Sequence, residues 1–149
     1  MIEIVNDHAG LTRCHAIRLE VFVDEQNVPL DEEVDDLDYA PSTIHLLGSI
    51  NGVDLATARV LPEEPGHCHI GRVAVRKSAR GTGVGREIMA AAAEVARERC
   101  ADADGRVEIK LSSQVQAVGF YAACGYELVP GEQYLDAGIW HRDMVLALS

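Results

Sequence analysis

Basic residues are scarce in this chain of 149 residues, in which 13 Lys and Arg stand against 24 Asp and Glu for a net charge of −11. Such a charge repels phosphate backbones and anionic lipid surfaces, so we expect neither nucleic acid nor a membrane as a partner. The same sign of charge is compatible with a cationic substrate such as an amine.

Long apolar runs and paired cysteines are also missing. No run is long enough to span a bilayer, and the chain does not open with a basic stretch and an apolar core, so no signal peptide is expected. The cysteines are widely spaced without a Cys-x-x-Cys pattern, which favours reduced thiols and a cytoplasmic protein. The length and the hydrophobic content of 48% predict a single domain over residues 1–149.

Metal-binding patterns are absent as well. His67 and His69 alternate in a predicted strand but lack further placed ligands, so no metal is expected there. Six carboxylates crowd into Asp31–Asp38, yet this segment has no glycine of the calcium-loop type. Two interpretations of the segment stay open: a solvated loop, or an exposed rim that attracts the amino group of a substrate.

What the chain does contain is a glycine-rich turn flanked by basic residues. It follows an apolar strand-like run and precedes residues 87–99, which are rich in strong helix formers. The N–H groups of such a turn and of the helix N-terminus bind anions, glycines admit a close approach, and arginines add positive charge. We therefore predict a diphosphate ligand at Arg80, Gly81, Thr82, Gly83, Val84, Gly85 and Arg86.

The spacing of this turn distinguishes it from other phosphate motifs. No Lys-Ser or Lys-Thr follows the glycines, as a P-loop requires, and the pattern is Gly-x-Gly-x-Gly instead of the dinucleotide fingerprint. Arg80, Gly83 and Gly85 match Arg/Gln-x-x-Gly-x-Gly/Ala, so the turn resembles the acyl-CoA pyrophosphate loop of the GNAT superfamily of N-acetyltransferases. The resemblance implies acetyl-CoA as co-substrate.

Periodicity and turn signals give the order β-α-β-β-β-α-β-α-β-β, which is similar to the GNAT topology over nearly the whole chain. The resemblance implies an α+β (α/β) fold, the GNAT acyl-CoA acyltransferase fold, with a mixed central sheet of about seven strands and flanking helices. Strands are expected at 1–5, 44–50, 53–61, 68–75, 107–111, 126–129 and 141–147, and helices at 9–23, from the glycine loop to about 100, and at 115–124.

Further segments resemble the ElaA/YjcF-like branch of this superfamily, namely 21–29, with Phe-Val-x-Glu-Gln-x-x-Pro, and 133–144, with Gly-Ile-x-His-x-x-Met. The resemblance implies an enzyme that moves the acetyl group of acetyl-CoA to a primary amine by direct attack in a ternary complex. Another acyl group or an O-acceptor is an alternative. So is a CoA-binding regulatory or interaction module with little catalysis. Dimers are frequent in the superfamily, so a homodimer is also considered.

The resemblance also implies roles for single residues. The strand Val73, Ala74 and Val75 would hold the pantetheine arm through its main chain, with the N–H of Val73 near the thioester carbonyl. Tyr121, in a Phe-Tyr block before Gly125, would be the acid that protonates the leaving thiolate. Gln114 stands where relatives often have an Asn that contacts CoA.

The acceptor side is less defined by sequence. His69 lies four residues before Val73 and is the candidate catalytic base, although relatives also use ordered water. Candidates for binding the substrate are Glu25, Gln26, His45, Arg72 and His141. Arg59 and Arg72 lie among apolar neighbours in strands, so we also consider them as ion-pair partners of Glu25 or of the acidic segment.

Overall fold

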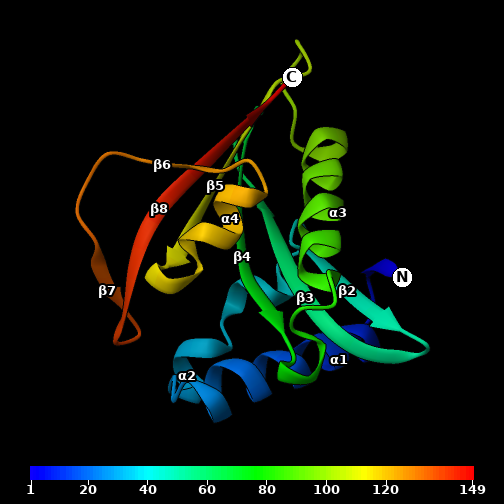
Figure 1. The fold of residues 1–149 in the computed structure, drawn as a ribbon. Helices are drawn as coiled ribbons and strands as arrows, with labels where there is room; N and C mark the ends of the chain where they lie inside the picture. The colour runs from blue at the N-terminus through cyan, green and yellow to red at the C-terminus, as the bar shows by residue number, and fades with distance from the viewer.

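The computed structural model describes residues 1–149 as one eight-stranded sheet with flanking helices (Figure 1). The strands are β1 (Ile2–Val5), β2 (Ile44–Ile50), β3 (Val53–Pro62), β4 (His67–Val75), β5 (Val107–Gln114), β6 (Glu127–Leu128), β7 (Tyr134–Asp136) and β8 (Ile139–Leu148). The α-helices are α1 (His8–Arg18), α2 (Leu30–Glu33), α3 (Val84–Arg99) and α4 (Val118–Ala123). A π-helical segment, η1 (Leu19–Glu25), continues α1, and short 3-10 turns are η2 (Asp36–Tyr39), η3 (Lys77–Ala79) and η4 (Val115–Ala117).

The strand order is β1-β2-β3-β4-β5-β8-β6, with β7 paired to β8. All neighbours are antiparallel except β4 and β5, which run parallel and pair only between 67–69 and 108–110. Beyond these residues the two strands are no longer hydrogen-bonded to each other, although both continue. The ends of β4 and β5 therefore separate, which opens the middle of the sheet.

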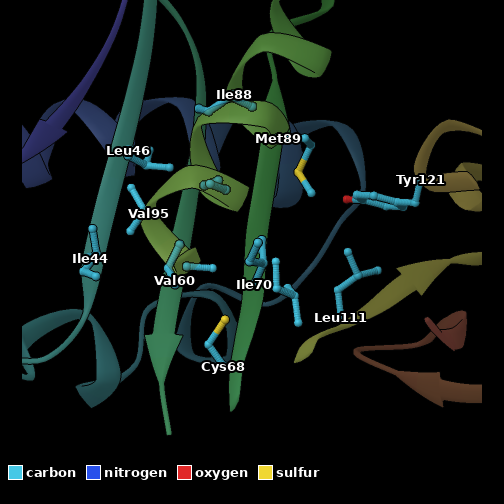
Figure 2. Packing of buried hydrophobic residues seen from close by; sticks show 14 of the residues in the cluster. Ile44, Leu46, Val60, Cys68, Ile70, Ile88, Met89, Val95, Leu111 and Tyr121 are labelled. Carbon is cyan, nitrogen blue, oxygen red and sulfur yellow. The ribbon is translucent and has the colours of Figure 1, made fainter. Parts of the chain in front are cut away.

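The core lies on both faces of the sheet because successive strand residues point to opposite sides. Leu46 of β2 packs in the larger buried cluster, which includes Ile88 and Met89 of α3 (Figure 2). Its neighbour Leu47 packs in a smaller cluster with Ile17 of α1. Helices α3 and α1 thus cover opposite faces of the sheet. The facing edges of β4 and β5 are free for a ligand where the two strands separate.

The predicted mixed sheet with flanking helices is confirmed. The strand expected over 107–111 runs on to residue 114, and the helix expected over 115–124 begins as η4 and is α-helical only over 118–123. Two further differences concern η1 and β7. The single helix expected over 9–23 ends as α1 at Arg18 and continues as η1. The strand β7 was not anticipated, because all three of its residues are exposed and no apolar alternation marks it. Ala137 and Gly138 join β7 to β8 with φ of 50° and 76°, the left-handed pair that a tight type I′ hairpin requires.

Candidate functional site

A cleft of about 1300 Å³ opens where β4 and β5 separate. Its walls come from segments far apart in the sequence, namely η1, α2, β4 with the glycine loop, the end of β5, α4 and the β7–β8 hairpin. Almost all of the predicted site residues line it. The exceptions are His45 and Val84, which are both buried elsewhere.

The glycine loop forms one end of this cleft and leads into α3. Gly81 and Gly83 have φ of 85° and 89°, and a Cβ at either position would meet no atom within 4 Å. Gly83 caps α3, whose first helical hydrogen bond runs from Glu87 N to Gly83 O (3.1 Å). The earlier N–H groups of Gly85 and Arg86 therefore have no intrahelical partner and suit an anion.

Gly85 also has a packing role that the sequence did not predict. We predicted that its missing side chain lets a pyrophosphate approach the backbone. In the structure, a Cβ on Gly85 would lie 3.3 Å from the ring of Phe120 and 3.4 Å from Val75. The glycine therefore permits close packing of α3 against α4.

Two contacts hold the end of η1 across the cleft. Glu25 accepts hydrogen bonds from Nη2 of Arg80 at 2.8 and 3.0 Å. Gln26 and Gln114 exchange amide hydrogen bonds of 2.7 and 3.3 Å over a sequence separation of 88 residues. Glu25 and Gln26, expected on the acceptor side, thus contact two residues that were expected to bind CoA. A bound pyrophosphate would compete with Glu25 for Arg80.

Strand β4 carries a bulge at the point where the cleft begins. Thr57 pairs with Ala74 and Arg59 with Gly71, so two residues of β4, Arg72 and Val73, stand opposite one residue of β3. Arg72 adopts φ of 52°, which is unusual for a residue with a side chain. The bulge breaks the regular ladder beside the position predicted for a thioester.

Tyr121 extends from α4 toward the central strands (Figure 2) and contributes to the wall of the cleft. Its ring packs edge-on against Phe120 and Tyr126, with centroids 5.1 and 6.1 Å apart. Burial raises the pKa of the Tyr121 phenol well above its ordinary value. The hydroxyl is therefore a proton donor, not an anion, at neutral pH.

The three candidate histidines have different surroundings. His45 is buried, its Nε2 lies 3.0 Å from the carbonyl oxygen of Asp38, and burial lowers its pKa. His69 is exposed at the rim, with Nδ1 2.9 Å from Glu63. His141 lies in the wall with Nδ1 2.7 Å from the carbonyl oxygen of Ile139.

The contact of His141 determines its tautomer. A carbonyl oxygen only accepts, so Nδ1 must carry the proton and Nε2 of the neutral ring is left with a lone pair. The ring is also held in place by stacking on Tyr134, with centroids 6.1 Å apart. His45, in contrast, is directed away from the cleft by its bond to the backbone.

The interpretation of Asp31–Asp38 as an exposed loop or rim is wrong for half of its carboxylates. Glu33 and Asp38 are buried, and Asp35 is partly buried. All three bind arginines that the sequence separates widely. Arg18 contacts Glu33 (2.7 Å) and Asp38 (2.8 Å), Arg59 contacts Asp35 (2.7 Å) and Asp38 (2.9 Å), and Arg72 contacts Glu33 (3.4 Å) and Asp35 (3.3 Å).

Sequence reasoning proposed Arg59 and Arg72 as ion-pair partners of this segment, and that is confirmed. The ion pairs of Arg18 and the position of Glu33 in the wall of the cleft were not predicted. The available signal was Arg18 between Ile17 and Leu19 on the apolar face of a predicted helix, where a buried cation needs a carboxylate.

No group of three or more His, Cys, Asp or Glu side chains is arranged to hold a metal ion. None of the helices combines the length and apolar character that a membrane crossing requires.

Comparison with known proteins matches residues 47–148 to the family described as an acetyltransferase (GNAT) domain. The uncharacterized N-acetyltransferase YjcF of Bacillus subtilis is 37% identical over 142 residues, which cover 95% of this chain and 96% of YjcF. The crystal structure of Escherichia coli ElaA is 29% identical with a TM-score of 0.83, covering 97% of this chain and 98% of ElaA. That of an acyl-CoA N-acyltransferase from Pseudomonas aeruginosa is 31% identical with a TM-score of 0.81, again covering 97% and 98%. The predicted resemblance to ElaA and YjcF is therefore confirmed.

Proposed function

This chain belongs to the GNAT acetyltransferase family, and we propose that it transfers the acetyl group of acetyl-CoA to a primary amine by direct attack in a ternary complex. The observation that carries this proposal is the glycine loop at the N-terminus of α3, which opens into the cleft between β4 and β5. Tyr121 lies in the wall of the same cleft. One continuous space can thus hold a diphosphate, a pantetheine arm and the reacting groups.

The residues divide the chemistry among them. Arg80, Arg86 and the loop N–H groups would bind the pyrophosphate, and the N–H of Val73 would polarise the thioester carbonyl. As the new C–N bond forms, the C–S bond breaks, and the Tyr121 hydroxyl would give its proton to the departing sulfur. The amine loses its proton to a base or to water.

We place the proton acceptor at His141 instead of His69, because Nε2 of His141 is unprotonated in the tautomer that Ile139 requires. His69 is held at the rim by Glu63. Replacing His141 with Asn keeps a donor for the Ile139 carbonyl and removes the basic nitrogen.

We expect His141→Asn to lower kcat/KM about tenfold at neutral pH and to move the acid limb of the pH–rate profile to higher pH, because the variant depends on amine that is already deprotonated. The defect should disappear at high pH, where the amine is already neutral. His69→Asn is the matched control, and it should retain the wild-type profile. A wild-type profile in His141→Asn together with a loss of activity in His69→Asn would identify His69 as the proton acceptor.

The experiment that tests the proposed function measures the release of free CoA thiol from acetyl-CoA in the presence of a panel of amines. Release that depends on the amine supports catalysis. Acetyl-CoA binding in calorimetry without any amine-dependent release would instead support the second candidate, a CoA-binding module. Offering other acyl-CoA donors and alcohols in the same assay identifies the acyl group and the acceptor atom.

The loop itself gives a separate prediction. Gly83→Val should weaken acetyl-CoA binding more than tenfold, or by over ~1.4 kcal/mol, because valine disfavours φ of 89° and fills the space next to the N–H groups. Gly52→Val is a matched control, since Gly52 has φ of 78° in a hairpin turn and equally open space. Calorimetry that finds similar losses in both variants, or none in Gly83→Val, would contradict the pyrophosphate assignment.

A further inference from the structure

The wall of the cleft beyond the bulge of β4 contains arginine donors that the protein does not use. An arginine has five N–H donors. Arg72 donates through Nε to the backbone oxygen of Glu33 (3.2 Å) and through Nη2 to the backbone oxygen of Glu32 (3.2 Å) and to Oδ2 of Asp35 (3.3 Å). Its Nη1 makes no hydrogen bond with the protein. About a quarter of its side chain is exposed (26%).

A second arginine stands beside it in the same wall. Arg59 is 4% exposed and uses Nη1 and Nη2 on Asp35 and Asp38. Its Nε is buried and has no hydrogen-bond partner. A buried polar group without a partner costs free energy, and a ligand or an ordered water in the cleft would satisfy it. Both arginines line the cleft.

The nearby carboxylates do not prevent Arg72 from binding an added anion. Glu33 is bound most closely by Arg18 (2.7 Å), and Asp35 by Arg59 (2.7 Å). Arg72 therefore shares carboxylates that already have a closer partner. Burial is the main cause that lowers the pKa of Arg72, although Glu33 and Asp35 oppose the shift, so an added anion would stabilise its charge.

The position of Arg72 connects this wall to the reaction. Arg72 directly precedes Val73, the residue whose N–H is assigned to the thioester, and the bulge holds it at φ of 52°. Arg80 and Arg86 lie at the other end of the separated part of β4, so the pyrophosphate has its own arginines. An exposed carboxylate, Glu32, lines the same wall and offers a partner for an ammonium group.

We propose that Arg72, supported by Arg59, binds a carboxylate of the acceptor, so that the acceptor is an amino acid and not a simple amine or polyamine. This inference rests on the proposed acetyl transfer. It follows from the guanidinium of Arg72, whose Nη1 has two unused N–H donors beside the reacting position. A planar guanidinium binds a carboxylate, whereas it would repel the additional cationic groups of a polyamine.

The test compares amino acids with the amines left when their carboxylate is removed, such as phenylalanine with phenethylamine and leucine with isoamylamine. Wild-type kcat/KM should favour the amino acid at least tenfold. Arg72→Gln should remove this preference by lowering kcat/KM for amino acids about tenfold, with little change for the amines or for acetyl-CoA binding. Arg72→Lys should recover part of it, and Arg13→Gln, which changes an exposed arginine paired with Asp54, should leave it intact.

A binding measurement separates the failure of this inference from the failure of catalysis. With CoA bound, N-acetylphenylalanine should bind at least tenfold more tightly than N-acetylphenethylamine in calorimetry, and Arg72→Gln should abolish the difference. Equal binding of the two products to the wild type would overturn the carboxylate subsite even if amines are acetylated. A preference for the acid without any turnover would retain the subsite and reject the enzyme.

Discussion

Replacing Tyr121 with phenylalanine should lower kcat about 100-fold and leave acetyl-CoA affinity nearly unchanged. The substitution removes one oxygen and keeps the ring that packs against Phe120 and Tyr126. If the hydroxyl protonates the departing sulfur, its loss forces a thiolate to leave without a proton. Steady-state kinetics with an accepted amine, together with calorimetry for acetyl-CoA, measures the two quantities separately.

Tyr126→Phe is a matched control from the same aromatic group. Tyr126 is also buried, its hydroxyl has no hydrogen-bond partner, and it lies outside the wall of the cleft. Removing that hydroxyl should leave kcat unchanged and should not reduce stability, since it removes an unpaired buried polar group. If both variants lose activity equally, the aromatic packing matters and the acid role of Tyr121 is wrong.

Asp38→Asn should reduce the free energy of unfolding by about 3–5 kcal/mol. The carboxylate is fully buried and accepts hydrogen bonds from Arg18 at 2.8 and 3.0 Å and from Arg59 at 2.9 Å, with Nε2 of His15 3.0 Å away. A neutral amide leaves two buried guanidinium groups short of a counter-charge. The same arginines also bind Glu33 of α2 and Asp35, which are the two carboxylates that contact Arg72. The variant therefore also tests whether the proposed carboxylate subsite depends on this network.

The loss should depend on pH. Burial alone would raise the pKa of Asp38, but the hydrogen bonds and charges of Arg18, with His15 and Arg59, outweigh it and hold the pKa well below its usual range. A carboxylate with a depressed pKa stabilises the fold above its unfolded pKa of about 4 and loses this contribution as the pH falls toward the folded pKa. The difference in stability between wild type and Asp38→Asn should therefore begin to narrow below about pH 4 and should be smaller at pH 3 than at pH 7.

Urea unfolding at pH 7 and pH 3 measures this difference. Asp36→Asn is the control, because Asp36 lies in the same segment, is exposed and has no ion-pair partner in the structure. It should change the free energy of unfolding by less than about 0.5 kcal/mol. Similar small losses in both variants would mean that the segment is a solvated loop after all.

The sequence by itself determined the strand, loop and helix to which we assign the acetyl donor. Strands and helices follow from local periodicity, and the glycine loop joins a strand to a helix within a single short segment. Gly81 and Gly83 need left-handed backbone, and Arg80 lies three residues before Gly83, so the proposed anion site is formed by neighbours in the chain. Local signals of this kind survive without knowledge of the tertiary structure.

Only the tertiary structure decided the part of the cleft that we assign to the acceptor. The acidic segment looks solvated in sequence, because nothing local reveals that Arg18, Arg59 and Arg72 meet it from a helix and two strands. The packing of α3 against α4 explains the need for a glycine at position 85, and the carbonyl oxygen of Ile139 sets the tautomer of His141. Each of these features depends on contacts between distant residues, and the side chains that remain unpaired can be identified only after all the other partners are placed.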